Sequence, residues 1–354
     1  MADPTTIPRD SLILVTAANG LIASHVADQL LAAGYRVRGT VRNVERCAWM
    51  ASLFGRVYGP DRLGRGHARR HGGRARAGAR RPERAGLRGR VRRGVAGARR
   101  GAGRGEAGFF FFGGGQQLRG FVFTSSAWAA YTPDAAIKQT LTQKSWNETA
   151  LSLAKPSNGI VTFDPSHAEP KYMLAPFMAL KTRIERAYWA WVEKEQPNFT
   201  CNTVLLDTVM GRCLDPRGPQ GVPSTAGMVR WVWDGTGRQV LDAMQPQWHI
   251  DTGDAGRLYV AALTQQGVGR ERIFGFGERF SWFQVRRLML EWYGDDRKKD
   301  IVPVADVGVD QTEVPNERGA ELLRRLGRPG WTGLEESLRA NMESIFEAEG
   351  ASSG

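Results

Sequence analysis

The stretch LILVTAANGLI, residues 12–22, decides the fold class of this chain. Its first four residues are apolar, which favours a strand buried on both faces of a sheet. Apolar residues after Gly20 recur at helical spacing as far as Leu31, and Gly34 stands where a helix end favours a left-handed residue. Residues 35–42 then alternate as a second strand. Strand, helix and strand in this order predict a βαβ unit.

The turn inside this unit, Thr16 to Gly20, has the form of a dinucleotide-binding turn. A strand that enters a helix through a glycine turn points backbone N–H groups and the helix dipole at a phosphate. Only Gly20 remains of the three glycines typical of such turns, so an ordinary strand–helix turn stays an alternative. The βαβ context favours dinucleotide binding. We expect the cofactor contacts to come from Thr16, Ala17, Asn19, Gly20, Leu21 and Ile22.

The end of the second strand predicts NADP as the cofactor. An acidic residue there would bind a ribose hydroxyl of NAD, whereas an arginine accommodates the 2′-phosphate of NADP. The chain has Arg38, Arg42 and Arg46 in this region and no acidic residue before Glu45. Each arginine could equally be a solvated surface charge. We expect Arg42, with Arg46 beside it, to contact the 2′-phosphate.

The net charge of +13 comes from one block of the 354-residue chain. Residues 56–106 contain 17 arginines, no lysine and three acidic residues, a net charge of +14, so the remainder carries only −1. Few aliphatic residues occur in this block, and it cannot offset its ordering entropy by burial. We therefore expect residues 56–108 to be disordered or irregular.

Several motifs resemble those of one known family. TAANGLIASHVADQLLAAGYRVRGTVRN (residues 16–43) resembles the N-terminus of extended short-chain dehydrogenases/reductases, in the NAD-dependent epimerase/dehydratase superfamily. Family-like motifs follow at FVFTSS (121–126), KSWNETA (144–150), KTRIE (181–185) and LGRPGWTGLEESL (326–338). The resemblance covers residues 9–54 and 119–348. The branch that it resembles comprises fungal NADPH-dependent aldehyde/ketone reductases, with plant dihydroflavonol reductases as cousins.

The resemblance implies an α/β architecture with a Rossmann-type, doubly wound parallel sheet and a smaller C-terminal substrate lobe. We expect the NADP-binding domain over residues 1–210, interrupted by the arginine-rich block, and the substrate lobe over residues 211–350. Some segments of the lobe are expected to return to the sheet. Leu206 stands where the family usually has a proline, and the block replaces the family's third and fourth strands.

The family also implies a Ser/Tyr/Lys triad. The tyrosine gives a proton to the carbonyl oxygen, the serine hydrogen-bonds the same oxygen, and the lysine lowers the pKa of the tyrosine and binds the nicotinamide ribose. Ser126 and Lys181 match the serine and the lysine, but Phe177 occupies the tyrosine position one helical turn before the lysine. Tyr172 lies nine residues before Lys181, a spacing that does not place it there. Because phenylalanine has no proton to give, we predict severely impaired carbonyl reduction.

Three interpretations of the arginine-rich block remain open. An arginine-rich arm would bind nucleic acid through its phosphates, but Tyr58 is the only aromatic residue of the block before Phe109, which leaves little for base stacking. The second interpretation is a solvated insertion, although the block has about the length that the family's third and fourth strands would need. The third is a stretch of GC-rich coding sequence read out of frame, because arginine, glycine, alanine and proline have GC-rich codons. We favour the third, which resequencing of the transcript tests.

The sequence thus predicts an NADP-dependent oxidoreductase that reduces a small-molecule aldehyde or ketone to an alcohol, impaired in this chain. The alternatives are a catalytically dead cofactor-binding relative and, less favoured, an arginine-rich nucleic-acid binder. Three cysteines without close pairing predict neither a metal site nor a disulfide framework. No run of 18 apolar residues occurs, so we expect a cytoplasmic protein without a membrane span. The substrate and the oligomeric state stay open.

Overall fold

The computed structural model describes residues 6–67, 109–112, 118–157, 160–163, 172–297 and 301–350. The strands of its large sheet are β1 (Leu12–Val15), β2 (Arg36–Val41), β3 (Leu63–His67), β4 (Phe109–Phe112), β5 (Gly120–Ser126), β8 (Thr200–Leu206) and β11 (Arg272–Gly275). The helices around it are α1 (Leu21–Ala32), α2 (Ala48–Tyr58), α3 (Glu148–Leu153), α4 (Ala175–Glu195), α7 (Thr252–Thr264) and α9 (Glu317–Arg325). Short 3₁₀ helices cover Glu45–Cys47 and Ala127–Ala129, and β6 (Ala154–Ser157) pairs with β7 (Ile160–Phe163) as a hairpin.

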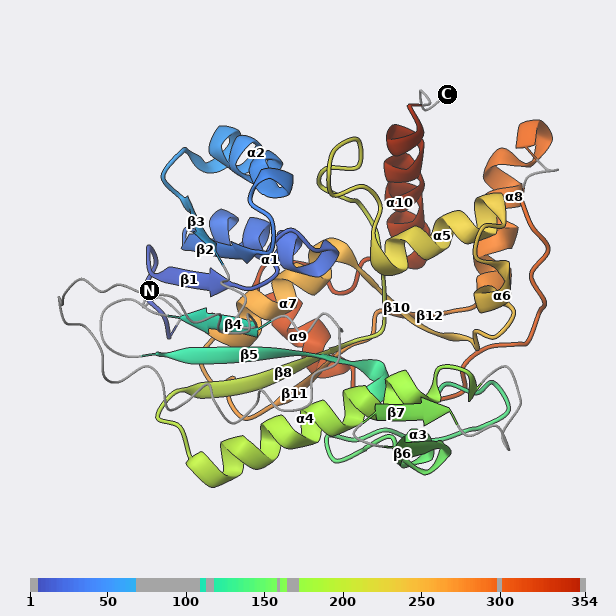
Figure 1. The fold of residues 1–354 in the computed structure, drawn as a ribbon, viewed down its shortest axis with the longest axis horizontal. Helices are drawn as coiled ribbons and strands as arrows, with labels where there is room; N and C mark the ends of the chain where they lie inside the picture. Colours follow the sequence, from blue (N-terminus) through green and yellow to red (C-terminus); the bar gives the residue numbers. More distant parts are fainter. Residues whose placement is uncertain are drawn as a thin grey trace, which may run out of the picture.

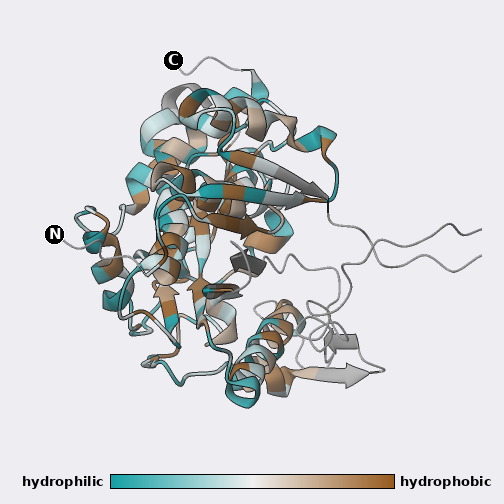
Figure 2. Ribbon diagram, turned by 90° about the vertical axis from the view of Figure 1, so that its left-hand side faces the viewer, coloured by the Kyte–Doolittle hydropathy of each residue, from teal (hydrophilic) through white to brown (hydrophobic). Residues whose placement is uncertain are grey.

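The large sheet has the strand order β11-β8-β5-β4-β1-β2-β3 (Figure 1). Every neighbouring pair is parallel except the two pairs that contain β4. Hydrophobic segments gather in the strands between the helices (Figure 2). The architecture confirms the predicted Rossmann-type α/β fold.

Successive side chains of β5 contact helices on opposite faces of this sheet. Phe121 and Phe123 contact Tyr188 of α4, with ring centroids 5.5 and 5.1 Å apart. Thr124 points to the other face because successive strand residues alternate, and there it accepts a 3.0 Å hydrogen bond from the Tyr259 hydroxyl of α7. Helices on both faces make the sheet doubly wound, as predicted.

The predicted βαβ unit is confirmed at the amino end of the chain. β1 pairs in parallel with β2, from Leu12 opposite Arg36 to Val15 opposite Gly39. Helix α1 connects them, and Gly34 after the helix has a left-handed backbone with φ 86°. The turn before α1 therefore lies at the carboxyl end of β1, where its backbone can face a ligand.

One strand, β3, extends regular structure into the amino end of the range that we expected to be irregular. β3 pairs in parallel with β2, from Val37 opposite Leu63 to Val41 opposite His67, so regular structure continues inside the range 56–108. The lone apolar Leu63 gave no pattern for a strand, but an edge strand needs only one neighbour. Residues 68–108, on which the rest of that expectation falls, lie outside the described residues. β4 occupies the place between β1 and β5 and is antiparallel to both.

A second group of elements contains β9 (Thr208–Met210), β10 (Gln247–Asp251), β12 (Glu278–Phe280), α5 (Ser224–Asp234), α6 (Arg238–Leu241), α8 (Trp282–Arg297) and α10 (Leu334–Glu349). The three strands form a small sheet of order β12-β10-β9, and the group packs around a core that includes Trp233, Trp282 and Met342. The division at residue 210 stays a prediction. No helix within the described ranges is long and apolar enough to span a membrane.

Candidate functional site

Four chain segments leave the large sheet at one edge. Because β1 and β5 both run antiparallel to β4, they run parallel to each other. The carboxyl ends of β1, β2, β5 and β8 therefore share this edge, which is where doubly wound sheets bind ligands. The segments that follow β1, β2 and β8 begin at Thr16, Arg42 and Asp207, and β5 ends at Ser126. The predicted cofactor and catalytic residues thus meet at the carboxyl edge.

The turn from Thr16 to Gly20 leads directly into α1. Gly20 has an extended backbone, with φ −74° and ψ 165°, and its carbonyl accepts the first helical bond from the Ser24 N–H at 2.9 Å. No side-chain hydrogen bond caps this end of the helix. The N–H groups of Leu21 and Ile22 have no acceptor within α1, and the positive end of the helix dipole lies beside them. These features suit the binding of a phosphate.

The turn is strained at one residue and tightly packed at the next. Ala17 has a left-handed backbone with φ 51°, a conformation that costs a residue with a Cβ atom about 1 kcal/mol. Ala18 is buried, and its N–H donates a 3.0 Å hydrogen bond to the Thr40 carbonyl oxygen. A Cβ atom added to Gly39 would lie only 2.8 Å from the Cβ of Ala18. Gly39 is therefore required for packing of the turn, a role that sequence reasoning missed.

Two arginines lie just beyond β2 at the same edge. Arg42 and Arg46 are exposed, and the Asn43 side chain accepts a 3.1 Å hydrogen bond from the Arg46 N–H. Neither guanidinium group makes an ion pair with any residue that the structure describes. Arg36, at the opposite end of β2, is instead paired with Asp10 at 3.5 Å. Arg42 and Arg46 are therefore accessible to an anion held at the carboxyl edge.

The predicted triad positions come together through α4 and the 3₁₀ helix after β5. The Ser126 hydroxyl accepts a 3.2 Å hydrogen bond from the Trp128 N–H, which leaves its own proton available to donate. The Trp128 ring meets the Phe177 ring edge-on, with centroids 5.8 Å apart. The Lys181 Nζ lies 5.3 Å from the centre of the Phe177 ring. The tyrosine position is thus beside the lysine, but its ring carries no acidic proton.

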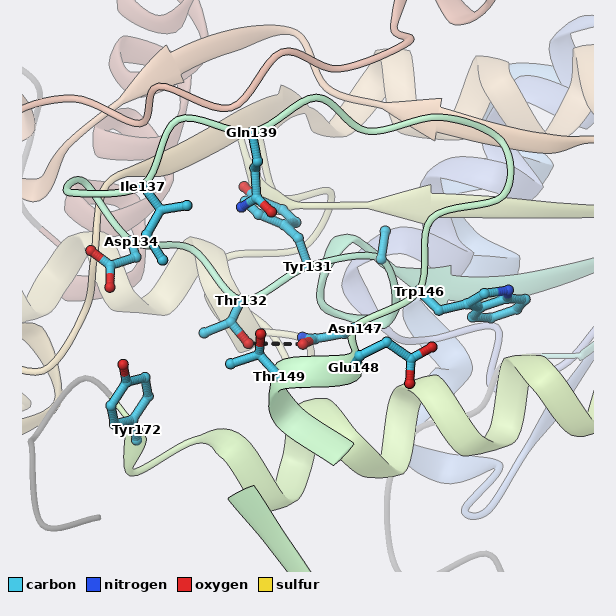
Figure 3. A pocket seen from close by; sticks show the side chains of 11 residues that line it. Tyr131, Thr132, Asp134, Ile137, Gln139, Trp146, Asn147, Glu148, Thr149 and Tyr172 are labelled. Atoms are coloured by element: carbon cyan, nitrogen blue, oxygen red, sulfur yellow. Dashed lines mark hydrogen bonds between the residues drawn. The ribbon is translucent and has the colours of Figure 1, made fainter. Parts of the chain in front are cut away.

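Tyr172 lies in a separate pocket. This pocket has a volume of about 120 Å³ and is also lined by Thr132, Asp134 and Asn147 (Figure 3). Asn147, from the KSWNETA motif, accepts a 2.9 Å hydrogen bond from the Thr132 hydroxyl and another of 2.9 Å from the Ala150 N–H, which caps α3. The ring contacts with Trp128 and Lys181 belong to Phe177.

Sequence reasoning missed a buried acidic cluster at the carboxyl end of β8. The Tyr131 hydroxyl lies 2.8 Å from Asp310 Oδ2 and 3.2 Å from Asp207 Oδ2. Burial raises the pKa of Asp207 to about 8; the Trp248 N–H opposes this shift, and the charge on Asp310 adds to it. Tyr131 and Asp310 are 179 positions apart, so no local pattern could have revealed the contact.

His25 and the three cysteines are buried. His25 Nε2 lies 2.8 Å from the Arg212 carbonyl oxygen, and burial lowers the pKa of this histidine to about 4. Cys47, Cys201 and Cys213 are buried free thiols. Among the described residues, no group of three or more His, Cys, Asp or Glu side chains could hold a metal ion.

The sequence is similar to fungal reductases over nearly its whole length. Aldehyde reductase 2 of Sporidiobolus salmonicolor is 30% identical over 368 residues, covering 95% of this chain and 96% of the relative. Ketoreductase adrE of Penicillium roqueforti is 31% identical over 354 residues, covering 95% and 97%. NAD-dependent epimerase/dehydratase terH of Aspergillus terreus is 27% identical over 379 residues, covering 96% and 98%. No family model matches the sequence.

Solved structures show the same fold. Gre2 from Candida albicans, solved in complex with NADPH, has a TM-score of 0.64 at 18% identity, covering 96% of this chain and 99% of that one. Vestitone reductase from alfalfa has a TM-score of 0.60 at 15% identity, covering 96% and 99%. Together with the 30% and 31% identity to the fungal reductases over 95% of this chain, this fold shows that the chain belongs to the extended short-chain dehydrogenase/reductase family, alongside fungal aldehyde and ketone reductases.

Proposed function

We propose that this chain is an NADP-dependent oxidoreductase that reduces an aldehyde or a ketone to an alcohol, and that Phe177 impairs the reaction. The observation that carries the proposal is the group formed by Ser126, Phe177 and Lys181. It provides a hydrogen-bond donor and a lysine next to a ring without a hydroxyl. It also lies at the carboxyl edge, together with the turn and the arginines that suit a dinucleotide.

NADP fits the residues present at this edge. The N–H groups at the start of α1, which have no acceptor within the helix, suit the pyrophosphate, and the exposed side chains of Arg42 and Arg46 suit the 2′-phosphate. The Lys181 ammonium group suits the hydroxyls of the nicotinamide ribose. When bound, NADPH supplies the hydride that reduces the carbonyl carbon. Because the Ala17 methyl stands where such turns have glycine, we expect weaker binding than in a chain with glycine there.

The side chains at the site would act on the carbonyl oxygen. The Ser126 hydroxyl would donate a hydrogen bond to this oxygen as negative charge develops on it. The positive charge of Lys181 would stabilise the same developing charge. Completion of the alcohol needs a proton, and the ring of Phe177 cannot provide one. General acid catalysis contributes about 10²–10⁴-fold, so we expect the turnover rate to be reduced by a factor of this size.

A second candidate function is cofactor binding without catalysis, which the same phenylalanine favours. The arrangement at the edge would then hold NADP without turning over a carbonyl compound. Titration with NADPH and NADH by calorimetry, followed by an assay with NADPH and a panel of aldehydes and ketones, separates the candidates. We expect tighter binding of NADPH than of NADH, with slow turnover. Binding without detectable turnover would support the second candidate, and neither binding nor turnover would contradict both.

A further inference from the structure

One buried carboxylate fastens α4 to the large sheet. Glu185 is 0% exposed, and its Oε2 accepts a 2.7 Å hydrogen bond from the Ser125 hydroxyl. Its Oε1 accepts hydrogen bonds from the Thr203 hydroxyl at 3.0 Å and from the Trp189 indole at 3.2 Å. Arg272 binds both oxygens, with Nε 2.9 Å from Oε1 and Nη2 3.2 Å from Oε2. The carboxylate thus joins α4 to β5, β8 and β11.

Arg272 extends this network to the KSWNETA segment. Its Nη1 donates hydrogen bonds to the carbonyl oxygens of Gln143 and Ser145, at 3.1 and 2.6 Å. Its guanidinium group lies 4.0 Å from the centre of the Trp146 ring. Arg272 itself is buried, at 6% exposed, and these contacts are partly buried. The family motifs that contain Trp146 and Glu185 therefore meet in one buried network.

We propose that Glu185 is a positioning residue, which fixes Lys181 relative to Ser126 through the Ser125 hydrogen bond and the paired bonds from Arg272. Lys181 precedes Glu185 by one helical turn, and Ser125 directly precedes Ser126. The hydrogen bond between Ser125 and Glu185 therefore fixes the end of β5 relative to the turn of α4 that carries Lys181. The proposal rests on the proposed function, because it assumes that Lys181 and Ser126 serve the cofactor and the carbonyl group.

The chemistry of the network supports a positioning role. A buried ion pair contributes little net stability compared with apolar residues of similar volume, because desolvation of both charges opposes their attraction. A planar guanidinium group that forms two bonds to one carboxylate nevertheless restricts the pair to a narrow geometry. Five hydrogen bonds converge on Glu185 from four other side chains, which restricts this geometry further. A network of this kind orients α4 more sharply than apolar packing would.

Acetylation of lysines in the full chain by an N-hydroxysuccinimide ester, quantified by peptide mass spectrometry, tests this role. Lys194, near the other end of α4 and 81% exposed, serves as the internal reference for Lys181. Glu185→Gln keeps the shape of the side chain but replaces one acceptor oxygen with an NH₂ group that faces other donors. We expect the ratio of Lys181 to Lys194 acetylation to rise about threefold or more as α4 loosens from β5.

The matched control is Val192→Ala, which opens a cavity under the same helix about two turns from Glu185. Compared at equal fraction folded, Val192→Ala should leave the ratio unchanged. A ratio in folded Glu185→Gln no larger than in Val192→Ala overturns the proposal. If Glu185→Gln does not fold, Ser125→Ala decides, because it removes a single hydrogen bond; a raised ratio there supports the role, and an unchanged ratio overturns it.

Repeating the acetylation with NADPH tests the proposed function separately. NADPH should protect Lys181 in the wild-type chain, because the lysine is expected to contact the nicotinamide ribose. Absence of protection contradicts that part of the proposed function. The ratios measured without cofactor still decide whether Glu185 positions Lys181, so the two failures are distinguishable.

Discussion

Arg36 and Arg42 stand at opposite ends of β2 and have different neighbours. Arg36 is paired with Asp10, whereas Arg42 is exposed at the carboxyl edge next to the turn before α1. A charge-assisted hydrogen bond to a phosphate contributes about 1.5–3 kcal/mol. Position along one strand therefore separates a surface ion pair from a candidate ligand of the 2′-phosphate.

Arg42→Ala should lower the affinity for NADPH by about 10- to 100-fold, because the charge-assisted contact to the 2′-phosphate is lost. The affinity for NADH, which lacks this phosphate, should stay nearly unchanged. Calorimetric titration with both cofactors measures the two effects. Arg36→Ala is the control and should alter neither affinity. An equal loss for NADPH and NADH would show that Arg42 does not read the 2′-phosphate.

The buried acid Asp207 predicts a pH dependence of stability. Burial raises the pKa of this carboxyl in the folded chain from 3.8 to about 8. Between these values the folded chain holds a proton that the unfolded chain releases, so the free energy of unfolding falls as the pH rises. His25 acts in the opposite direction between about pH 4 and 6.5, because burial lowers the pKa of this histidine. A single variant measured against the wild type isolates the contribution of Asp207.

Asp207→Asn should remove this contribution, because the amide resembles the protonated acid. We expect nearly equal unfolding free energies for variant and wild type near pH 4. The advantage of the variant should grow by up to about 1.4 kcal/mol per pH unit and level off above pH 8. Urea unfolding across this range measures it. Asp242→Asn, at a half-exposed surface position, is the control. A difference that does not change with pH would refute the assignment.

At the scale of elements, the turn between β1 and α1 combines a suitable anion site with a strained residue. Gly20 allows the backbone of the turn to pack closely, since a Cβ atom at this position would lie 3.3 Å from the Ala17 carbonyl oxygen. Ala17 itself adopts φ 51°, where glycine is favoured. The element keeps the helix N-terminus of a dinucleotide site while its first glycine position carries a methyl group.

Ala17→Gly should stabilise the chain by about 1 kcal/mol and tighten NADPH binding, because it removes both the backbone strain and the methyl group. Gln196, at the end of α4, has φ 42° and provides a matched control remote from the turn. Gln196→Gly should leave NADPH affinity unchanged. Denaturant unfolding and calorimetry give the two quantities. An unchanged NADPH affinity in Ala17→Gly would mean that the methyl group does not crowd the cofactor.

Elements with a clear period were predictable from the sequence. The apolar run of β1, the helical spacing of α1 and the strand ending in Ser126 all carry local signals, and the structure has each of them. β3 and β4 carry no such signal, since one is rich in arginine and glycine and the other is four phenylalanines. Their places in the sheet come from pairing with β2, β1 and β5, which only the three-dimensional arrangement specifies.

The site divides in the same way. Ser126, Phe177, Lys181 and Arg42 could be predicted as site positions because each stands at a fixed spacing from a motif or a strand end. The only sequence signal for Glu185 was its position in KTRIE, one helical turn after Lys181. Its partner Arg272 lies 87 positions further along, in a strand where a buried charge has no local explanation. Contacts over such separations depend on the fold and leave no period in the sequence.

At the scale of the whole molecule, β4 is the main departure from a doubly wound parallel sheet. Val15 lies opposite Phe110 and Ile13 opposite Phe112, so the amino end of β4 points to the carboxyl edge. In a parallel arrangement the carboxyl end of this strand, and the loop after it, would reach the cofactor. The reversed strand lies between β1 and β5, and its carboxyl end is at the opposite edge of the sheet.

Replacing residues 63–117 with the corresponding segment of the Sporidiobolus aldehyde reductase 2 should therefore strengthen cofactor binding. A parallel central strand would restore a loop at the carboxyl edge, and we expect NADPH to bind about tenfold more tightly or better, which is 1.4 kcal/mol. A glycine/serine linker of equal length in the same place is the control and should give no gain. Calorimetry on the three chains provides the comparison. Unchanged affinity in the chimera would show that the block does not limit the cofactor site.

The account as a whole depends on Phe177, a residue that is 41% exposed and that lies beside Lys181. The most direct measurement is NADPH oxidation by wild type, Phe177→Tyr and Phe177→Leu with a panel of aldehydes and ketones. We predict a gain of about 10²–10⁴-fold in kcat/KM for Phe177→Tyr at unchanged NADPH affinity, and none for Phe177→Leu. A wild type as active as Phe177→Tyr, or a Phe177→Tyr variant that binds NADPH and gains nothing, would contradict it.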